Sequence, residues 1–410
     1  MNRRSLFVHT RMRNKEELQI GLIRWDSYPP DMRAHRVSKY LTNQGHDVHF
    51  LCENDGTQPD REVINGVTVE RVKSKNDSVL RKAFFHATLM DYHWYKKIKH
   101  SITHSSFDLL HVIELNPLRT VILANKNKLP IVADLRELYP ESMVAHKKSM
   151  RFHQRLLRPI WRYKRLERNV LSQVDGLIVE SSVAKSHYVE NFDIDPERVV
   201  VSRNVPDLQL LREIAEDVNP PDYPEEFIVT YVGNFTTQRD LATLLRAVDL
   251  LREDGLSLRL LMVGDGADRE RLEGLTDELG ISDCVEFTGW VSYERMFDYL
   301  AASDVGISLC QKGNKDSECA IPNKLFQYMF MHVPPIVGDF PAMREVIEDT
   351  DSGLVVPCEN PEELAKAIRK LHTDRDLLEE LGKNGHRAVV EEYNFANEGR
   401  SLLDIYQKVL

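Results

Sequence analysis

The chain has 410 residues and a mass of 47.5 kDa, about two to three times the size of a typical domain, so we expect two domains with separate cores. Hydrophobic residues make up 42% and charged residues 29%, with only 19 Gly and 18 Pro, which excludes a fibrous or globally disordered chain. No apolar run approaches the roughly 20 residues that span a bilayer.

The N-terminus and the cysteines bear on the cellular compartment. Residues 1–17 form a basic tail that lacks the apolar stretch and the small-residue cleavage site of a secretion signal. The five cysteines are odd in number and include no CxxC pair, which argues against a disulfide framework and against a zinc site. We therefore expect a cytoplasmic protein without a metal, with the inner face of the membrane as an alternative location.

Charge is distributed unevenly along the chain. Up to residue 215 there are 35 Lys and Arg against 26 Asp and Glu, and beyond it 19 against 38, so the two parts carry +9 and −19. The segment 147–168 concentrates nine basic residues and a single acid, Glu167, with aromatic residues between them. An anionic membrane surface fits this pattern, and a solvated amphipathic helix is the simpler alternative. Nucleic acid ranks last as a partner, because the protein is acidic overall and no recognised motif is present.

Short apolar runs alternate with helical patterns through the first part of the chain. In order, we predict strand 19–25, a helix ending near 45, strand 47–52, strand 66–72, helix 79–102, strand 108–113, helix 117–126, strand 129–134, a basic helix to about 172, strand 176–180, a short helix and strand 198–202. This alternation is typical of a parallel sheet that helices cover on both faces.

A change in composition then marks the predicted domain boundary. Residues 216–226 hold three prolines and five acids, which is typical of a linker, so we expect domains at 18–215 and 227–392. Beyond the linker we predict strand 227–232, helix 241–252, strand 257–263, helix 269–279, strand 285–287, helix 293–301, strand 305–309, helix 323–331, strand 335–337 and a last amphipathic helix within 393–410. The fold class is therefore α/β, with two doubly wound Rossmann-like domains and ligands expected in the cleft between them.

Three loops of the second domain have the chemistry of a phosphate site. Gly233 and Gly264 each follow a strand, and a glycine permits close approach of a phosphate to the backbone. Pro322 starts a helix whose first turn carries Lys324, which adds a cation to free N–H groups. For the Gly233 loop alone an ordinary strand-to-helix loop is the better explanation, and for the Gly264 loop a plain tight turn is equally good. Three such loops in one domain nevertheless favour a diphosphate site.

These residues resemble the retaining, nucleotide-sugar-dependent group 1 glycosyltransferases of the GT-B fold. The resemblance rests on YVGNFTTQRDLATLLRAV, LLMVGDGADRERL, VEFTGWV, LAASDVGISL, IPNKLFQYM, PPIVGD and SGLVVPCENPEELAKAI, and less strongly on SYPPDMR, NQGHDV, IVADLRELYPE and VSRNVPD in the first domain. It implies two Rossmann-like domains, a donor site in the second, acceptor binding in the first, and a C-terminal helix that returns to the first domain.

The resemblance also implies roles for individual residues. Gly233 and Arg239 meet the donor diphosphate, where Arg239 replaces the usual Lys and Asn234 replaces a frequent Arg. The remaining donor-binding candidates of the second domain are Gly264, Thr288, Gly289, Pro322, Asn323, Lys324 and Leu325. Two signature glutamates align with Cys319 and Gln327; Gln327 retains hydrogen bonding to a ribose, and Glu318, one residue out of register, is the catalytic candidate.

In the first domain, VADLRE places Arg136 at or near a histidine that meets the donor sugar, so Arg136 is, beside Glu318, the other catalytic candidate. An ordinary charged strand end is the alternative. Arg33 is a phosphate-binding candidate, whereas His46 and His111 are expected to cap strand ends. The implied reaction is metal-free transfer of a sugar to an acceptor hydroxyl on a glycan or lipid-linked glycan, with retention of configuration, in cell-envelope polysaccharide or glycolipid synthesis. Two alternatives remain open: a non-catalytic glycosyltransferase-like partner protein, and a sugar-nucleotide epimerase of the same fold.

Overall fold

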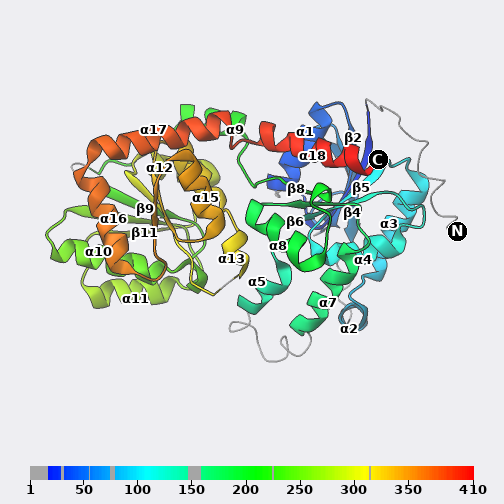
Figure 1. The fold of residues 1–410 in the computed structure, drawn as a ribbon, viewed down its shortest axis with the longest axis horizontal. Helices are drawn as coiled ribbons and strands as arrows, with labels where there is room; N and C mark the ends of the chain where they lie inside the picture. Colours follow the sequence, from blue (N-terminus) through cyan, green and yellow to red (C-terminus); the bar gives the residue numbers. More distant parts are fainter. Residues whose placement is uncertain are drawn as a thin grey trace. The chain divides into compact units, whose positions relative to one another are not determined.

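The computed structural model describes residues 17–28, 32–54, 56–73, 79–145, 158–223, 226–313 and 315–410. The basic tail up to residue 16 and residues 147–157 of the basic segment therefore lie outside the described residues. The chain divides into two compact units, of which the first comprises Met1–Ser202 with Glu398–Leu410 and the second comprises Arg203–Asn397. Each unit contains one sheet with helices on both of its faces (Figure 1).

The sheet of the first unit has the strand order β3-β4-β2-β1-β5-β6-β7-β8. Its strands are β1 (Gln19–Ser27), β2 (Asp47–Asn54), β3 (Arg61–Ile64), β4 (Val67–Lys73), β5 (Leu109–Ile113), β6 (Ile131–Leu135), β7 (Gly176–Val179) and β8 (Val199–Val201). Strands β5 and β6 are buried along their whole length, as expected for parallel strands covered on both faces. The edge strand β3 was not predicted from the sequence; it pairs antiparallel with β4 through the turn residues Asn65 and Gly66, both with positive φ.

The helices of the first unit pack around this sheet. They are α1 (Met32–Asn43), α2 (Val79–Thr88), α3 (Tyr92–His104), α4 (Leu115–Ala124), α5 (Tyr139–Ala145), α7 (Ile160–Leu171), α8 (Ser182–Phe192) and, from Glu398 onward, α18 (Phe395–Val409). The prediction of one helix over 79–102 is wrong. Leu89 adopts a φ of 53°, and the Asp91 side chain accepts from the N–H groups of His93 and Trp94, so a new helix begins there.

The second unit has the strand order β11-β10-β9-β12-β13-β14, with parallel pairing throughout. Its strands are β9 (Phe227–Val232), β10 (Leu258–Val263), β11 (Val285–Gly289), β12 (Val305–Ser308), β13 (Pro335–Gly338) and β14 (Leu354–Val356). Its helices are α9 (Leu208–Glu216), α10 (Leu241–Glu253), α11 (Arg269–Leu279), α12 (Tyr293–Ala301), α13 (Lys315–Cys319), α14 (Asn323–Phe330), α15 (Pro341–Thr350), α16 (Pro361–Thr373) and α17 (Arg375–Glu391).

The compact units divide between Ser202 and Arg203, whereas composition places the boundary at 216–226. The reason is that the intervening segment is attached to the second unit. The backbone N–H of Asn219 donates to Asp298 of α12, and the Tyr223 hydroxyl donates to Glu286 of β11. The proline-rich stretch is thus anchored on one side by specific hydrogen bonds, which its composition does not reveal.

In the described part of the chain, no helix is both long enough and apolar enough to cross a membrane.

Candidate functional site

Three glycine turns meet at the carboxyl ends of β9, β10 and β11. The Gly233 N–H donates to the carbonyl of Val263 at 2.9 Å, and Gly264 and Gly289 form an isolated antiparallel bridge. Gly233 and Gly264 have φ values of 135° and 137°, and a Cβ on Gly264 would overlap the Gly233 carbonyl oxygen. Only glycine fits at Gly264, so the turns lie backbone to backbone at the edge where a parallel sheet usually binds its ligand.

Lys324 brings a buried cation to these turns. It lies in the first turn of α14, where only 9% of it is exposed, and its Nζ sits 3.7 Å from the centroid of the Tyr231 ring. Burial, together with the positive charge of Arg239, lowers the pKa of Lys324 well below its usual value. No carboxylate among the residues described lies within ion-pair distance of this amine. An anion bound here would meet an amine without a carboxylate partner and would favour its protonated form.

A small pocket of about 70 Å³ adjoins this region and contains two of the predicted donor residues, Arg239 and Pro322. Arg239 ends a short 3₁₀ turn, and its Nη1 lies 3.7 Å from the Cys310 sulfur. Pro322 is the N-cap of α14, as the sequence predicts. The pocket is also lined by Asp316 of α13, which was not predicted from the sequence. Its position six residues before Pro322 is the sequence feature that could have indicated it.

The other residues of the second unit that the sequence predicts for the site do not line this pocket. Gln327 is 8% exposed, and its Nε2 donates to the Tyr293 hydroxyl at 3.3 Å. Glu318 lies half-buried on α13 and is not among the residues that line the pocket. Leu325 is fully buried, and its N–H bonds to the Pro322 carbonyl, so it offers a donor no free polar group. Asn234 and Asn323 are exposed, and the Thr288 hydroxyl donates to the carbonyl of Gly289.

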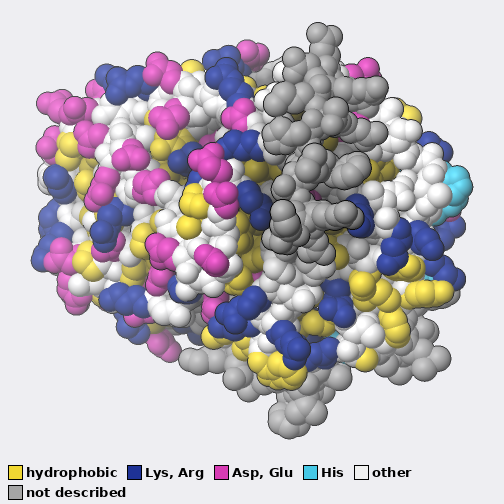
Figure 2. All heavy atoms as spheres, turned by 45° about the vertical axis from the view of Figure 1, so that its right-hand side comes forward, with side chains coloured by type: hydrophobic (Ala, Val, Ile, Leu, Met, Phe, Trp, Pro, Cys, Tyr) yellow, Lys and Arg dark blue, Asp and Glu magenta, His cyan; other side chains and the backbone are white. Residues whose placement is uncertain are grey.

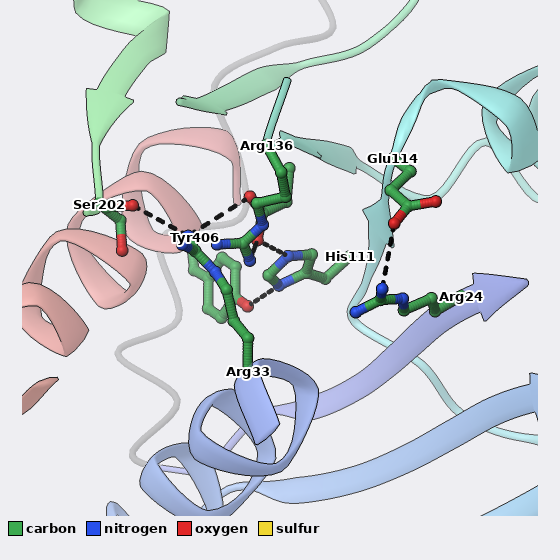
Figure 3. Close-up of polar contacts among 8 residues, drawn as sticks. Arg24, Arg33, His111, Glu114, Arg136, Ser202 and Tyr406 are labelled. Carbon is green, nitrogen blue, oxygen red and sulfur yellow. Dashed lines mark hydrogen bonds and ion pairs between the residues drawn. The ribbon is translucent and has the colours of Figure 1, made fainter. Parts of the chain in front are cut away.

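The first unit holds a second polar cluster, at the carboxyl ends of its strands (Figure 3). Asp134, at the end of β6, is fully buried and pairs with Arg136. Arg33 of α1 donates to the carbonyl of Ser202 at 2.9 Å and lies 3.8 Å from the Asp134 carboxylate. Burial lowers the pKa of the Arg33 guanidinium, while the carboxylate of Asp134 opposes that shift. The two arginines predicted from the sequence thus share one carboxylate.

His111 ties the same carboxylate to the C-terminal helix. Its Nε2 lies 3.1 Å from the Asp134 carboxylate, and its Nδ1 lies 2.5 Å from the Tyr406 hydroxyl (Figure 3). Burial raises the pKa of Tyr406, so its hydroxyl stays protonated and donates to Nδ1, which leaves Nε2–H to donate to the carboxylate. His111 is therefore a buried structural link, and its partner Tyr406 could not be found from sequence spacing.

Two family models match the chain in succession. Residues 32–210 match the model "Glycosyltransferase Family 4", and residues 214–388 match the model "Glycosyl transferases group 1". Among curated relatives, a lipopolysaccharide core biosynthesis glycosyltransferase of Rhizobium meliloti is 30% identical over 184 residues, 45% of this chain and 50% of the relative. The chain matches only about half to three fifths of the length of several such relatives.

A phosphatidyl-myo-inositol mannosyltransferase of Mycobacterium tuberculosis is 24% identical, and the match covers 96% of this chain and 97% of the relative. Solved structures share the fold at low identity. A sucrose-phosphate synthase of Thermosynechococcus elongatus has a TM-score of 0.74 at 19% identity, with 95% and 98% of the two chains covered. The Anabaena protein HepE, solved in complex with UDP-glucose, has a TM-score of 0.68 at 13% identity, with 94% and 98% covered.

The glycine turns at the strand ends, the cation at the start of α14 and the two successive family matches agree with one another. The chain belongs to the group 1 glycosyltransferases, family 4, and has their GT-B fold.

Proposed function

We propose that the protein transfers a sugar from a nucleoside diphosphate sugar to an acceptor hydroxyl with retention of anomeric configuration. One observation carries the proposal: the backbone turns at Gly233 and Gly264 converge with Arg239 and Lys324 in one region of the second unit. Close backbone approach, a bidentate guanidinium and a helix start are together the features that hold a diphosphate.

The same groups suit the chemistry of the reaction. Negative charge develops on the leaving diphosphate while an oxocarbenium-like centre forms on the sugar, and preorganised donors stabilise that charge without reorganisation. Arg239 supplies a fixed charge, and Lys324 becomes fully charged when an anion offsets the cost of its burial. In this proposal the departing phosphate accepts the proton of the attacking hydroxyl on the same face, so no protein base is needed.

For the acceptor we propose a glycan or lipid-linked glycan of cell-envelope synthesis. The support is the basic first part of the chain and the names of two relatives, which act in lipopolysaccharide core synthesis and on phosphatidyl-myo-inositol. We also propose that the basic segment 147–168 rests on an anionic membrane; only its residues 158–168 are described. Vesicle binding that does not weaken with added salt would contradict this location.

The non-catalytic alternative is favoured by one observation. By the resemblance, the two signature glutamate positions are occupied by the buried Cys319 and by Gln327, whose amide donates to the Tyr293 hydroxyl. A protein of this kind would bind a donor without turnover or bind none. The epimerase alternative would need an acid and base set beside the donor, and the described residues that line the small pocket contain one acid, Asp316.

The test is thermal unfolding of the full chain with UDP-, GDP-, ADP- and dTDP-sugars, compared with Arg239→Ala and with Arg246→Ala as a matched control. Arg246 is an exposed arginine of α10 in the same unit. A ligand at one hundred times its dissociation constant stabilises by about 2.7 kcal/mol, a rise of several degrees. We expect a shift with one nucleotide family, lost in Arg239→Ala and kept in Arg246→Ala.

An acceptor screen with the identified donor then separates the three functions. Sugar transfer with a retained anomeric configuration supports the proposal. Epimerised sugar released without acceptor would support the epimerase. A thermal shift with no turnover, or no shift with any donor, would support the non-catalytic partner.

A further inference from the structure

A wide pocket lies in the first unit, and none of the residues of the polar cluster around Asp134 lines it. Its volume is about 1120 Å³, and it is formed by residues 87–89 after α2, by Arg119 of α4, and by one face of α7 between residues 161 and 172. This volume is at the upper end of what ligand pockets have, so a ligand larger than one phosphate fits. None of the residues predicted to bind the donor lies in it.

The lining is strongly basic. It includes five cations, Arg119, Arg162, Lys164, Arg165 and Arg168, and the lining residues that are described include no acid. Two of the five are engaged: Arg162 donates to the carbonyls of His86 and Ala87, and Lys164 pairs with Glu141 at 2.8 Å. The other three have no carboxylate within ion-pair distance in the described part of the chain. Their charge is therefore available to an anionic ligand.

The packing of α7 explains why the charge is not neutralised. The opposite face of this helix, with Tyr163, Glu167 and Val170, is buried against the rest of the unit. Glu167 is the single acid of the segment, and it accepts from the Tyr188 hydroxyl at 3.3 Å. The helix thus turns its acid inward and Arg165 and Arg168 outward, since both arginines are exposed.

Apolar side chains lie beside the cations. Trp161, at the start of α7, is 65% exposed and lines the pocket together with Leu89. Phe84, on the neighbouring α2, is 41% exposed. Figure 2 shows Lys and Arg side chains next to exposed hydrophobic ones on the face of the first unit that it presents. Exposed aromatic and apolar groups next to cations fit a ligand that carries both phosphate and hydrocarbon.

We infer that this pocket binds the phosphate of a lipid-borne acceptor. The inference rests on the proposed function, because it identifies a phosphate-bearing lipid or lipid-linked sugar as the acceptor class. Arg119, Arg165 and Arg168 hold the phosphate, and Trp161 lies against the hydrocarbon at the pocket rim. The pocket is an anchoring site, and sugar transfer takes place elsewhere on the acceptor.

The test compares binding of the full chain to phosphatidylcholine vesicles that contain phosphatidic acid or phosphatidylglycerol, adjusted to equal surface charge. Binding is followed by co-sedimentation and by Trp161 emission, with Trp161→Phe to assign the signal. We expect tighter binding to phosphatidic acid, whose phosphate is terminal and accessible. Arg165→Gln with Arg168→Gln should weaken that binding by about fivefold per removed cation.

The matched control is Lys96→Gln with Lys99→Gln, two exposed lysines of α3 in the same unit. Equal losses in the two double variants, or equal binding to the two vesicle types, would overturn the inference in favour of unspecific surface attraction. Soluble glycerol 3-phosphate or inorganic diphosphate should release the protein only at far higher concentration than that of the vesicle phosphatidic acid, because they lack the hydrocarbon. Release at a comparable concentration would overturn the inference, since the ligand would then be a free phosphate compound.

Failure of this inference is distinguishable from failure of the proposed function. The donor-induced thermal shift depends on Arg239 and Lys324 in the second unit, so it should be unchanged in Arg165→Gln with Arg168→Gln. If the wild-type chain shows no donor shift but prefers phosphatidic acid, the pocket stands as a phospholipid site and the transferase proposal fails.

Discussion

Arg24 Nη2 lies 3.1 Å from Glu114 Oε1, so an ion pair joins β1 to the residue that follows β5 (Figure 3). These two strands are neighbours at the point where the strand order changes direction, which is where doubly wound sheets bind ligands. Glu114 adopts a φ of 74° and a ψ of 162°, a region that is accessible almost only to glycine. Burial raises the pKa of Glu114, and the guanidinium of Arg24 opposes the rise.

Replacing Glu114 by Gly should give a more stable protein than replacing it by Ala, by about 1–2 kcal/mol. Both variants lose the carboxylate and its ion pair, so the difference between them isolates the backbone strain. The measurement is chemical denaturation of both variants. At the exposed helical residue Glu190 of α8, the order should reverse and Ala should be the more stable. If alanine were the more stabilising replacement at both positions, the backbone of Glu114 would be unstrained.

Gly264→Ala should cost well over about 2 kcal/mol of unfolding free energy. The added Cβ overlaps the carbonyl oxygen of Gly233, and the φ of 137° is unfavourable for alanine. Gly274→Ala is the matched control, because Gly274 lies within α11 with no atom within 4 Å of an added Cβ, and it should stabilise slightly. The measurement is thermal unfolding of both variants. Similar unfolding midpoints for Gly264→Ala and Gly274→Ala would show that the glycine turns are not in contact.

Lys324→Met should raise the thermal midpoint of the free protein and weaken donor binding by about tenfold or more. Burial lowers the pKa of Lys324, so its protonated form costs the folded state free energy. This cost is complete below the lowered pKa and disappears as pH rises from there to the ordinary lysine pKa. Donor binding has the opposite dependence and weakens as pH rises through the same pKa. Thermal unfolding across pH measures the first dependence and calorimetric titration with donor measures the second, with the exposed Lys370→Met as control. A pH dependence that persists in Lys324→Met would assign it to another group.

Glu167 should make the protein less stable as pH rises from about 4.5 to 7. Burial raises the pKa of Glu167 to about 7 against the bond from Tyr188, so the folded state binds more protons in this range than the unfolded chain. The stability that this group contributes is complete below pH 4.5 and is lost as pH passes 7, up to about 3 kcal/mol. Glu167→Gln should remove that dependence in thermal scans at pH 5 and pH 8. An unchanged slope in the variant would exclude Glu167 as its source.

Local sequence patterns were enough to predict most helices and strands of the second unit. The apolar runs before Gly233 and Gly264 and the Pro-Asn-Lys start of the helix at Pro322 predicted strand ends and a helix N-terminus where the structure has them. These features depend on neighbours in sequence, because hydrophobic periodicity and glycine or proline geometry act within a few residues. The helix break at Leu89 was missed because it depends on a single backbone angle and a cap at Asp91.

The sequence by itself determined the α/β fold class, the glycine turns and the basic character of the first part of the chain. Only the tertiary structure decided which acid of α13 faces the pocket, that Leu325 belongs to the core, and that Arg33 and Arg136 share Asp134. The bond between His111 and Tyr406 joins residues 295 positions apart. Such partners are selected by the packing of whole elements and by the need of buried polar groups for hydrogen bonds, which no local pattern encodes.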